Sequence, residues 1–324
     1  MAYSIRNYNS ADATLWNDFI IKSKNGTFLF HRDFMEYHSD RFEDFSLMVF
    51  DDAKLVAVFP ANRQGDEIHS HQGLTYGGLV YGSSLKLAKV VEIFSVLLRF
   101  ALEQGIAKLY IKLIPSIYVV MPSEEINYAL FLATAKLVRR DSLSVINPDN
   151  PGKISKDRRD GVKRGIKNNL RIVEEANFQV FWENVLIPNL STKHNAIPVH
   201  TLQEIMLLHE RFPNNIRQFN VYKDDTIVAG TTFFVTDTVA HSQYTSAVEG
   251  KNETGSLDYL YHHLITEVFA DKKYFDFGIS NEQQGRKLNG GLSYWKESFG
   301  AQTIVQDFYE VETANYSLLM RFLT

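Results

Sequence analysis

Two charged residues near the end of the sequence have the setting that acid–base or electrostatic chemistry needs. Asp276 lies inside the apolar and aromatic run 274–278, which predicts a buried strand that ends at a glycine. A buried carboxylate needs partners and often has a shifted pKa, so Asp276 is a candidate base or substrate anchor. Lys296 lies on a short helix predicted for residues 292–299 and is a candidate for stabilising a developing negative charge. The structural alternatives are a carboxylate bonded to nearby backbone and an ordinary surface lysine.

The polar stretch between them, residues 280–291, contains three glycines and predicts a loop. Loops that follow core strands are where α/β folds bind ligands. Asn281 and Arg286 are therefore candidate substrate-binding residues, and Arg286 could clamp a phosphate or a carboxylate. A solvated arginine is an equally good interpretation.

Composition restricts the class of protein. The chain has 324 residues, a length typical of two domains, and 45% of them are hydrophobic, which is enough for two cores. The net charge of -4 gives no global preference for nucleic acid or membranes. There is no cysteine, signal-peptide core or apolar run of membrane-spanning length, so we expect a cytoplasmic protein without a membrane span. No histidine spacing is typical of a metal site, and we expect none.

The order of predicted elements divides the chain into two similar halves. Each half reads as helices, a hairpin of strands, and then alternating strands and helices, which predicts mixed α/β domains. The loop 147–152, rich in proline, asparagine and aspartate, is the best boundary. We expect an N-terminal domain over residues 1–150 and a C-terminal domain over residues 151–311.

The densest charge run of the chain opens the second half. At helical spacing it forms a basic and an apolar face: Arg159, Lys163, Lys167 and Arg171 on the first, and Val162, Ile166 and Leu170 on the second. The functional interpretation is an anion site for the phosphates of a nucleotide, a lipid diphosphate or a tRNA. The alternative is a solvated helix face.

Three stretches together resemble the Fem family of peptidoglycan aminoacyltransferases and their acetyltransferase relatives. Residues 55–60 with 73–80 are similar to the family's first hairpin and Y-G-G segment, and residues 155–167 are similar to the basic helix that opens its second domain. Residues 275–300 resemble its closing D-F-G…G-L…F-K…F-G pattern, in which Lys296 matches the family lysine. The chain departs from the pattern at Trp295, where the family usually has phenylalanine, and it lacks the helical arm of longer members.

The resemblance implies an α/β fold of two tandem GNAT-like (acyl-CoA N-acyltransferase) domains, with the tail 312–324 packed on the first. It also implies an N-acyltransferase that moves an acyl or aminoacyl group onto an amine of a cell-envelope precursor, linked to peptidoglycan or an amino sugar. The donor would be acyl-CoA or aminoacyl-tRNA rather than a tightly bound cofactor. The acceptor would be a phosphorylated small molecule or lipid-linked, with tRNA as a further partner, and the protein a monomer or homodimer.

The loop 248–256 corresponds to the segment that wraps the pyrophosphate of coenzyme A in ordinary GNAT enzymes. Gly250, Gly255 and Ser256 suit that role because their backbone N–H groups lie at a helix N-terminus, and Tyr244 precedes them as a substrate-binding candidate. The acidic residues of this loop oppose the role, and the usual glycine signature is missing.

Two further functions stay open on the sequence. One is a binding protein that recognises an anionic glycan precursor without catalysis, and the other is a tRNA-binding protein. Convergence of Asp276, Lys296 and Arg286 on one cleft would favour the enzyme, and their divergence would favour the binding protein.

Overall fold

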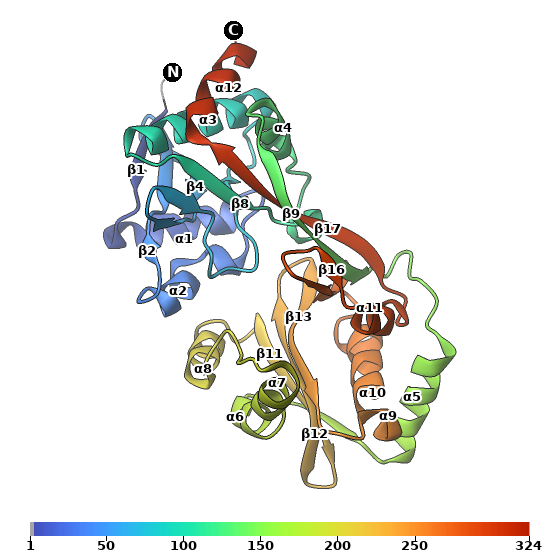
Figure 1. The fold of residues 1–324 in the computed structure, drawn as a ribbon. Helices are drawn as coiled ribbons and strands as arrows, with labels where there is room; N and C mark the ends of the chain where they lie inside the picture. The colour runs from blue at the N-terminus through green and yellow to red at the C-terminus, as the bar shows by residue number, and fades with distance from the viewer. Residues whose placement is uncertain (1–2, 324) are drawn as a thin grey trace. The chain divides into compact units, whose positions relative to one another are not determined.

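The computed structural model describes residues 3–323 of the chain, which divides into two compact units (Figure 1). The first unit comprises the residues up to Asp141 and those from Val305 onward, and the second comprises Ser142–Ile304. The divisions fall inside the long strands β9 (Lys136–Ile146) and β17 (Gln302–Glu312). Each unit is described by itself.

The first unit contains two groups of strands and a helical layer. Its elements besides parts of β9 and β17 are β1 (Ser4–Asn7), α1 (Ala13–Lys22), α2 (Arg32–Met35), β2 (Glu43–Asp44), β3 (Leu47–Asp51), β4 (Lys54–Phe59), β5 (Asn62–Gln64), β6 (Glu67–His69), β7 (Val80–Tyr81), α3 (Leu87–Glu103), β8 (Lys108–Lys112), α4 (Glu125–Leu132) and α12 (Tyr316–Leu323). Strands β1, β3, β4 and β7 form one antiparallel sheet, while β2, β5, β6, β8 and β17 pair in that order.

The core of the first unit forms beneath the long helix α3. The apolar side chains on the inward face of α3, from Val90 to Ala101, are buried, and Leu319 of α12 is also fully buried in the same cluster. Helix α12 packs on α3 and α4; Thr324, the last residue of the tail, lies outside the described residues. Strand β4 ends at Phe59, so Pro60 marks the point where the chain leaves the sheet.

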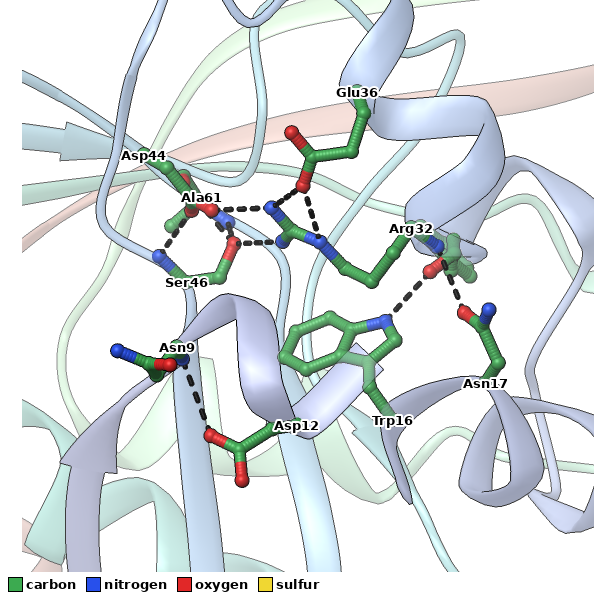
Figure 2. A network of polar contacts seen from close by, with 10 residues as sticks. Asn9, Asp12, Trp16, Asn17, Arg32, Glu36, Asp44, Ser46 and Ala61 are labelled. Carbon is green, nitrogen blue, oxygen red and sulfur yellow. Dashed lines mark hydrogen bonds and ion pairs between the residues drawn. The ribbon is translucent and has the colours of Figure 1, made fainter. Parts of the chain in front are cut away.

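A buried arginine ties the helices of this unit to its strands, as Figure 2 shows. Arg32 is only 4% exposed and donates to Glu36 Oε1, Asp44 Oδ2 and Ser46 Oγ. The guanidinium carbon of Arg32 lies 3.7 Å from the centre of the Tyr8 ring. Two carboxylates thus balance one buried cation, which is how proteins tolerate such a charge. We read this network as structural.

The second unit is a sheet with helices on both faces. Its elements are α5 (Lys156–Lys167), β10 (Arg171–Glu174), α6 (Phe178–Phe181), α7 (Ile187–His194), α8 (Leu202–Arg211), β11 (Ile216–Lys223), β12 (Thr226–Val235), β13 (Val239–Ala247), α9 (Lys251–Thr254), α10 (Ser256–His263), β14 (Tyr274–Ile279), β15 (Asn281–Glu282), β16 (Lys287–Leu288) and α11 (Gly290–Glu297). Helices α5, α10 and α11 lie on one face, and α6, α7 and α8 on the other (Figure 1).

The strand order of this sheet places β13 next to β14. Strands β10, β11, β12 and β13 are antiparallel neighbours, β13 pairs with β14 in parallel, and β14 pairs with the second-unit end of β9. An aromatic core made largely of Phe233, Tyr261, Phe275 and Phe277 lies between this sheet and α10. No helix in the described part of the chain is long and apolar enough to cross a membrane.

Candidate functional site

The second unit contains a cavity of about 660 Å³ beside the end of its central strands. Its walls come from the second half of β13, the start of α9, the first turns of α10, strand β14 and helix α11, with Arg158 from α5 at one side. All of these residues belong to the second unit. The carboxyl ends of neighbouring parallel strands are a common place for ligand sites in α/β folds.

The cavity lies where β13 and β14 separate. Their described pairing stops at His241 and Asp276, although β13 continues to Ala247 and β14 to Ile279. Gly278 has φ +73°, a left-handed conformation that suits glycine, and an added Cβ would lie 3.2 Å from His241. The chain therefore turns at Gly278, and the strands leave a gap between them.

Lys296 lines this cavity from α11. The helix begins after Asn289, whose side chain accepts the N–H of Leu292. The Lys296 ammonium donates to Gly278 O at 2.9 Å and to Ile279 O at 2.6 Å, and the residue is 4% exposed. Burial lowers its pKa to about 8, and the negative charge of nearby Asp276 opposes that shift. This lysine is a buried cation with only two of its three N–H groups bound to the backbone.

Asp276 supports this arrangement from the interior. Its side chain is fully buried, accepts Gly278 N–H at 2.7 Å, and lies 2.9 Å from Nδ1 of His241. Asp276 therefore holds the N–H of the same glycine whose carbonyl oxygen binds Lys296. It does not line the cavity, which argues against direct contact with a substrate.

A β-bulge brings two hydroxyls of β13 to the same wall. The register with β12 shifts between the pairs of Tyr244 and Ser242, so Gln243 is an extra residue. As a result Ser242 and Thr245, which strict alternation would place on opposite faces, lie 2.8 Å apart between their oxygens. Both contact the hydroxyl of Tyr261 on α10, and all three residues line the cavity.

An ion pair between Arg158 and Asp258 forms another part of the cavity wall. Asp258 of α10 is 5% exposed and accepts from Arg158 of α5 and, at 3.4 Å, from Nε1 of Trp295. Burial raises the pKa of the Asp258 carboxyl, while Arg158, Trp295 and Arg164 oppose that shift. Trp295 thus supplies a hydrogen-bond donor that a phenylalanine at this position would lack.

Two predicted substrate-binding residues lie away from the cavity. Arg286 is exposed on the turn between β15 and β16. Asn281 is used locally, because its side-chain oxygen accepts the backbone N–H of Ser142 at 2.6 Å and its hydroxyl at 2.8 Å. Asp276, Lys296 and Arg286 therefore do not converge on one cleft, and by that criterion their placement favours a binding protein.

Tyr244 also points away from the cavity. It is 9% exposed on the other face of the bulged strand, and its hydroxyl lies 2.6 Å from Nδ1 of His200 and accepts His200 N–H at 3.1 Å. Burial raises the pKa of the Tyr244 phenol to about 12. Its contacts with Trp182 and His200 indicate a structural role.

The basic helix differs from expectation in its packing face. Gly161 and Gly165 are its buried residues, and an added Cβ at Gly161 would lie 1.8 Å from Asp258 Oδ2. Ile166, expected on the packed face, is 60% exposed. The prediction of an apolar packing stripe was wrong at this residue, because α5 approaches α10 too closely for side chains.

The expected basic row is at the surface of α5. Arg159, Lys163 and Lys167 are exposed and do not line the cavity. Arg159 donates to Ile154 O at 2.6 Å, and Lys163 lies 3.1 Å from Asp160. Another residue of this helix, Arg158, reaches the cavity instead.

The loop before α10 also lines the cavity, but the residues that do so are not those predicted from the sequence. Gly255 has φ +70°, and an added Cβ would lie 2.1 Å from Gly161 O, so this glycine permits helix packing. Ser256 is fully buried, its hydroxyl has no hydrogen-bond partner, and neither it nor Gly250 lines the cavity. Lys251 and Asn252 do line it.

Sequence reasoning missed the hydroxyls of Ser242, Thr245 and Tyr261 and the pair of Arg158 with Asp258. The available signal was the run of polar residues HSQYTS, which forms most of strand β13. The described residues contain no group of three or more metal-ligating side chains.

Comparison with known proteins shows similarity in structure only. No protein-family model matches the sequence, and no curated protein matches it in sequence. The crystal structure of FemX matches with a TM-score of 0.66 at 9% identity, over 99% of this chain and 100% of that one. The C-terminal domain of a putative lysylphosphatidylglycerol synthetase from Agrobacterium fabrum matches with a TM-score of 0.61 at 12% identity, over 97% and 96% of the two chains. The L-PGS of Bacillus licheniformis matches with a TM-score of 0.55 at 9% identity, over 87% and 89%. The expected fold class is confirmed: over nearly its whole length, the chain has the tandem Fem/GNAT-like fold.

Proposed function

We propose that this protein is an N-acyltransferase of the Fem/GNAT type and that the second-unit cavity is its active site. The observation that supports this most is the placement of Lys296 in the cavity wall, with its ammonium bound to the carbonyls of Gly278 and Ile279. Acyl transfer to an amine needs a held carbonyl group and a fixed positive charge or N–H group for the oxyanion that forms. A buried ammonium in a wall between separated strands meets that need.

The chemistry of the lysine fits the role. With a pKa of about 8, Lys296 is mostly protonated at neutral pH. Two N–H groups are occupied by backbone carbonyls, so the third can point to the carbonyl oxygen of an acyl donor. As the amine attacks, negative charge develops on that oxygen next to a preorganised cation in a site of low polarity.

Asp276 then acts through Lys296 rather than on the substrate. It orients Gly278 and provides a negative charge that keeps the lysine protonated. This role replaces that of a direct base, because the Asp276 side chain is sealed from the cavity. The enzyme proposal thus depends on Lys296 and the cavity, and not on convergence with Arg286.

We further propose that an acyl or aminoacyl group is moved onto an amine of a cell-envelope precursor, linked to peptidoglycan or an amino sugar. The structural likeness to FemX and to a domain of a putative lysylphosphatidylglycerol synthetase supports an aminoacyl donor. The cavity is lined by the cations of Arg158, Lys251 and Lys296, against the single carboxylate of Asp258. This balance suits a donor or acceptor that carries negative charge.

The exposed basic row of α5 is the proposed contact for substrate phosphates outside the cavity. Substituting Lys163 and Lys167 by glutamate should weaken binding of a phosphorylated acceptor or tRNA and leave the fold intact, because both side chains are exposed. The measurement is the salt dependence of the affinity for that ligand. The slope of log affinity against log salt concentration should be shallower for the variant than for the wild type. An unchanged slope would remove this row from the proposal.

A transfer assay tests the proposed function. The protein is incubated with radiolabelled acetyl-CoA or with charged tRNA, each with amine acceptors from the peptidoglycan and amino-sugar classes, and labelled amide product is counted. Product formation that Lys296→Met removes and Lys287→Met retains would support the proposal; Lys287 is exposed and paired with Glu282. Tight acceptor binding without product from any donor would instead support the binding protein that the divergence of Asp276 and Arg286 favours.

A further inference from the structure

Three hydroxyl groups in the cavity wall contact one another and are not used by the proposed chemistry of Lys296. We call Ser242, Thr245 and Tyr261 the hydroxyl cluster. Each of its three oxygens is within hydrogen-bond distance of the other two: 2.8 Å between Ser242 and Thr245, 2.5 Å between Ser242 and Tyr261, and a close contact between Thr245 and Tyr261. In each pair either oxygen could be the donor.

The cluster lies between the cavity and a buried threonine. Behind it lies Thr231, which is fully buried and donates its one hydroxyl hydrogen to Tyr244 O at 2.8 Å. Thr231 Oγ1 also lies 3.4 Å from the Ser242 oxygen, 3.2 Å from the Thr245 oxygen and 3.3 Å from the Tyr261 oxygen. While its hydrogen is donated to Tyr244 O, Thr231 accepts from the cluster. The three cluster residues all line the cavity, as does Lys296.

The surroundings of Tyr261 do not themselves call for a hydroxyl. Its ring is stacked on Phe277 at 5.3 Å and packs edge-on against Trp295 at 5.0 Å, with Phe275 and Phe299 at 6.0 Å. A phenylalanine would suit such a core and would avoid the cost of burying a polar group. Ser242 and Thr245 face this hydroxyl only because of the bulge at Gln243.

From this geometry we propose that the hydroxyl cluster is a proton shuttle for the transfer reaction, a step that rests on the proposed function. In the reaction the neutral amine forms a C–N bond with the acyl carbon, and the bond from that carbon to the sulfur or oxygen of the carrier breaks. The amine must lose one proton and the carrier atom must gain one. The cluster accepts the proton at one hydroxyl and releases another from a second hydroxyl, so its own hydrogen count is unchanged and only the direction of its hydrogen bonds reverses.

The shuttle accounts for a gap in the chemistry of the site. Asp276 is sealed from the cavity, and Asp258 is held by Arg158 and Trp295. A relay needs no free base, because it moves the proton directly between two atoms of the reactants. Burial raises the pKa of the Tyr261 phenol, which keeps it protonated and able to both accept and donate.

The test compares variants that remove or keep one hydroxyl. Thr245→Val removes the hydroxyl at nearly constant shape, Thr245→Ser keeps it, and Tyr261→Phe removes the phenol oxygen. Tyr222→Phe and Thr236→Val are matched controls: the first loses a hydroxyl that binds Glu175, and the second loses one that accepts Val239 N–H. Rates are measured in H₂O–D₂O mixtures with the donor and acceptor pair that the wild type uses fastest.

The shuttle predicts that Thr245→Val and Tyr261→Phe lower kcat by about 100-fold with little change in KM. The wild type should show a solvent isotope effect with a curved dependence on D₂O fraction, which these variants lose and Thr245→Ser and both controls retain. If the wild type transfers the acyl group and Thr245→Val keeps its kcat and its isotope effect, the shuttle is wrong and the proposed function stands. A wild type that transfers nothing from any donor overturns the proposed function and the shuttle with it.

Discussion

Removal of the Lys296 charge gives a prediction that does not depend on knowing the substrate. Replacing Lys296 with methionine keeps most of the side-chain volume and removes the buried ammonium. In the wild type this group has a pKa of about 8 when folded and 10.5 as its reference value. The variant should therefore change how the free energy of unfolding depends on pH between these two values.

The direction follows from which state binds the proton. Below pH 8 the lysine is charged in both the folded and the unfolded chain, and the folded state bears the cost of burying that charge. Between pH 8 and 10.5 the folded lysine is neutral while the unfolded one stays protonated, so wild-type stability rises with pH. The difference between 10.5 and about 8 corresponds to about 3 kcal/mol, of which about 2 kcal/mol is gained between pH 7 and 9.5.

The assay is denaturant unfolding of wild type and Lys296→Met at pH 7 and pH 9.5. The stability of wild type relative to the variant should increase by about 2 kcal/mol across this interval. Lys287→Met, measured in the same way, is the control for the loss of an exposed lysine. A wild-type-minus-variant difference that stays constant with pH would refute a desolvated ammonium at this site.

Three further substitutions test the supports of the site. Gly161→Ala should destabilise the protein by about 1–3 kcal/mol in denaturant unfolding, because an added Cβ would lie 1.8 Å from Asp258 Oδ2; stability equal to wild type would contradict the close approach of α5. Trp295→Phe should lower stability by about 1 kcal/mol through loss of the N–H donor to Asp258, and an unchanged midpoint would show that this 3.4 Å contact contributes nothing. Asp276→Asn removes the negative charge that raises the pKa of Lys296, so the alkaline limb of the transfer rate should move to lower pH. If the alkaline limb stays at the same pH or moves to higher pH, Asp276 does not raise the pKa of Lys296.

Local patterns in the sequence were sufficient for the elements that position the site. The apolar run at residues 274–278 forms β14, and the short helix expected over residues 292–299 is present as α11. These features depend on contacts within a few residues, which the sequence shows directly. Lys296 was singled out because it matches the lysine in the closing pattern of the Fem family, which the sequence resembles.

The side chains around Lys296 could not be found in the same way. Ser242 and Thr245 share a wall only because of a bulge, and an alternating strand pattern selects Tyr244 instead. The position of such a bulge is decided by pairing with β12, which lies outside any local pattern.

The packing of α5 shows a second limit. Hydrophobic periodicity assigned its buried face to Ile166, whereas the helix packs through Gly161 and Gly165. A helix can approach its neighbour this closely only where it has no side chains, as at a glycine. A search for periodic apolar residues does not count glycines, so it does not mark such a face as buried. Reading paired glycines four residues apart as a contact face would have predicted the approach to α10.

The central claim, that the cavity of the second unit carries out acyl transfer, is tested most directly by single-turnover transfer with the Lys296→Met variant. With the donor and acceptor that the wild type uses fastest, the variant should form product about 100–1000-fold more slowly, the effect of removing an oxyanion donor, while Lys287→Met matches wild type. Equal rates for wild type and Lys296→Met would contradict the claim and place the chemistry elsewhere in the chain.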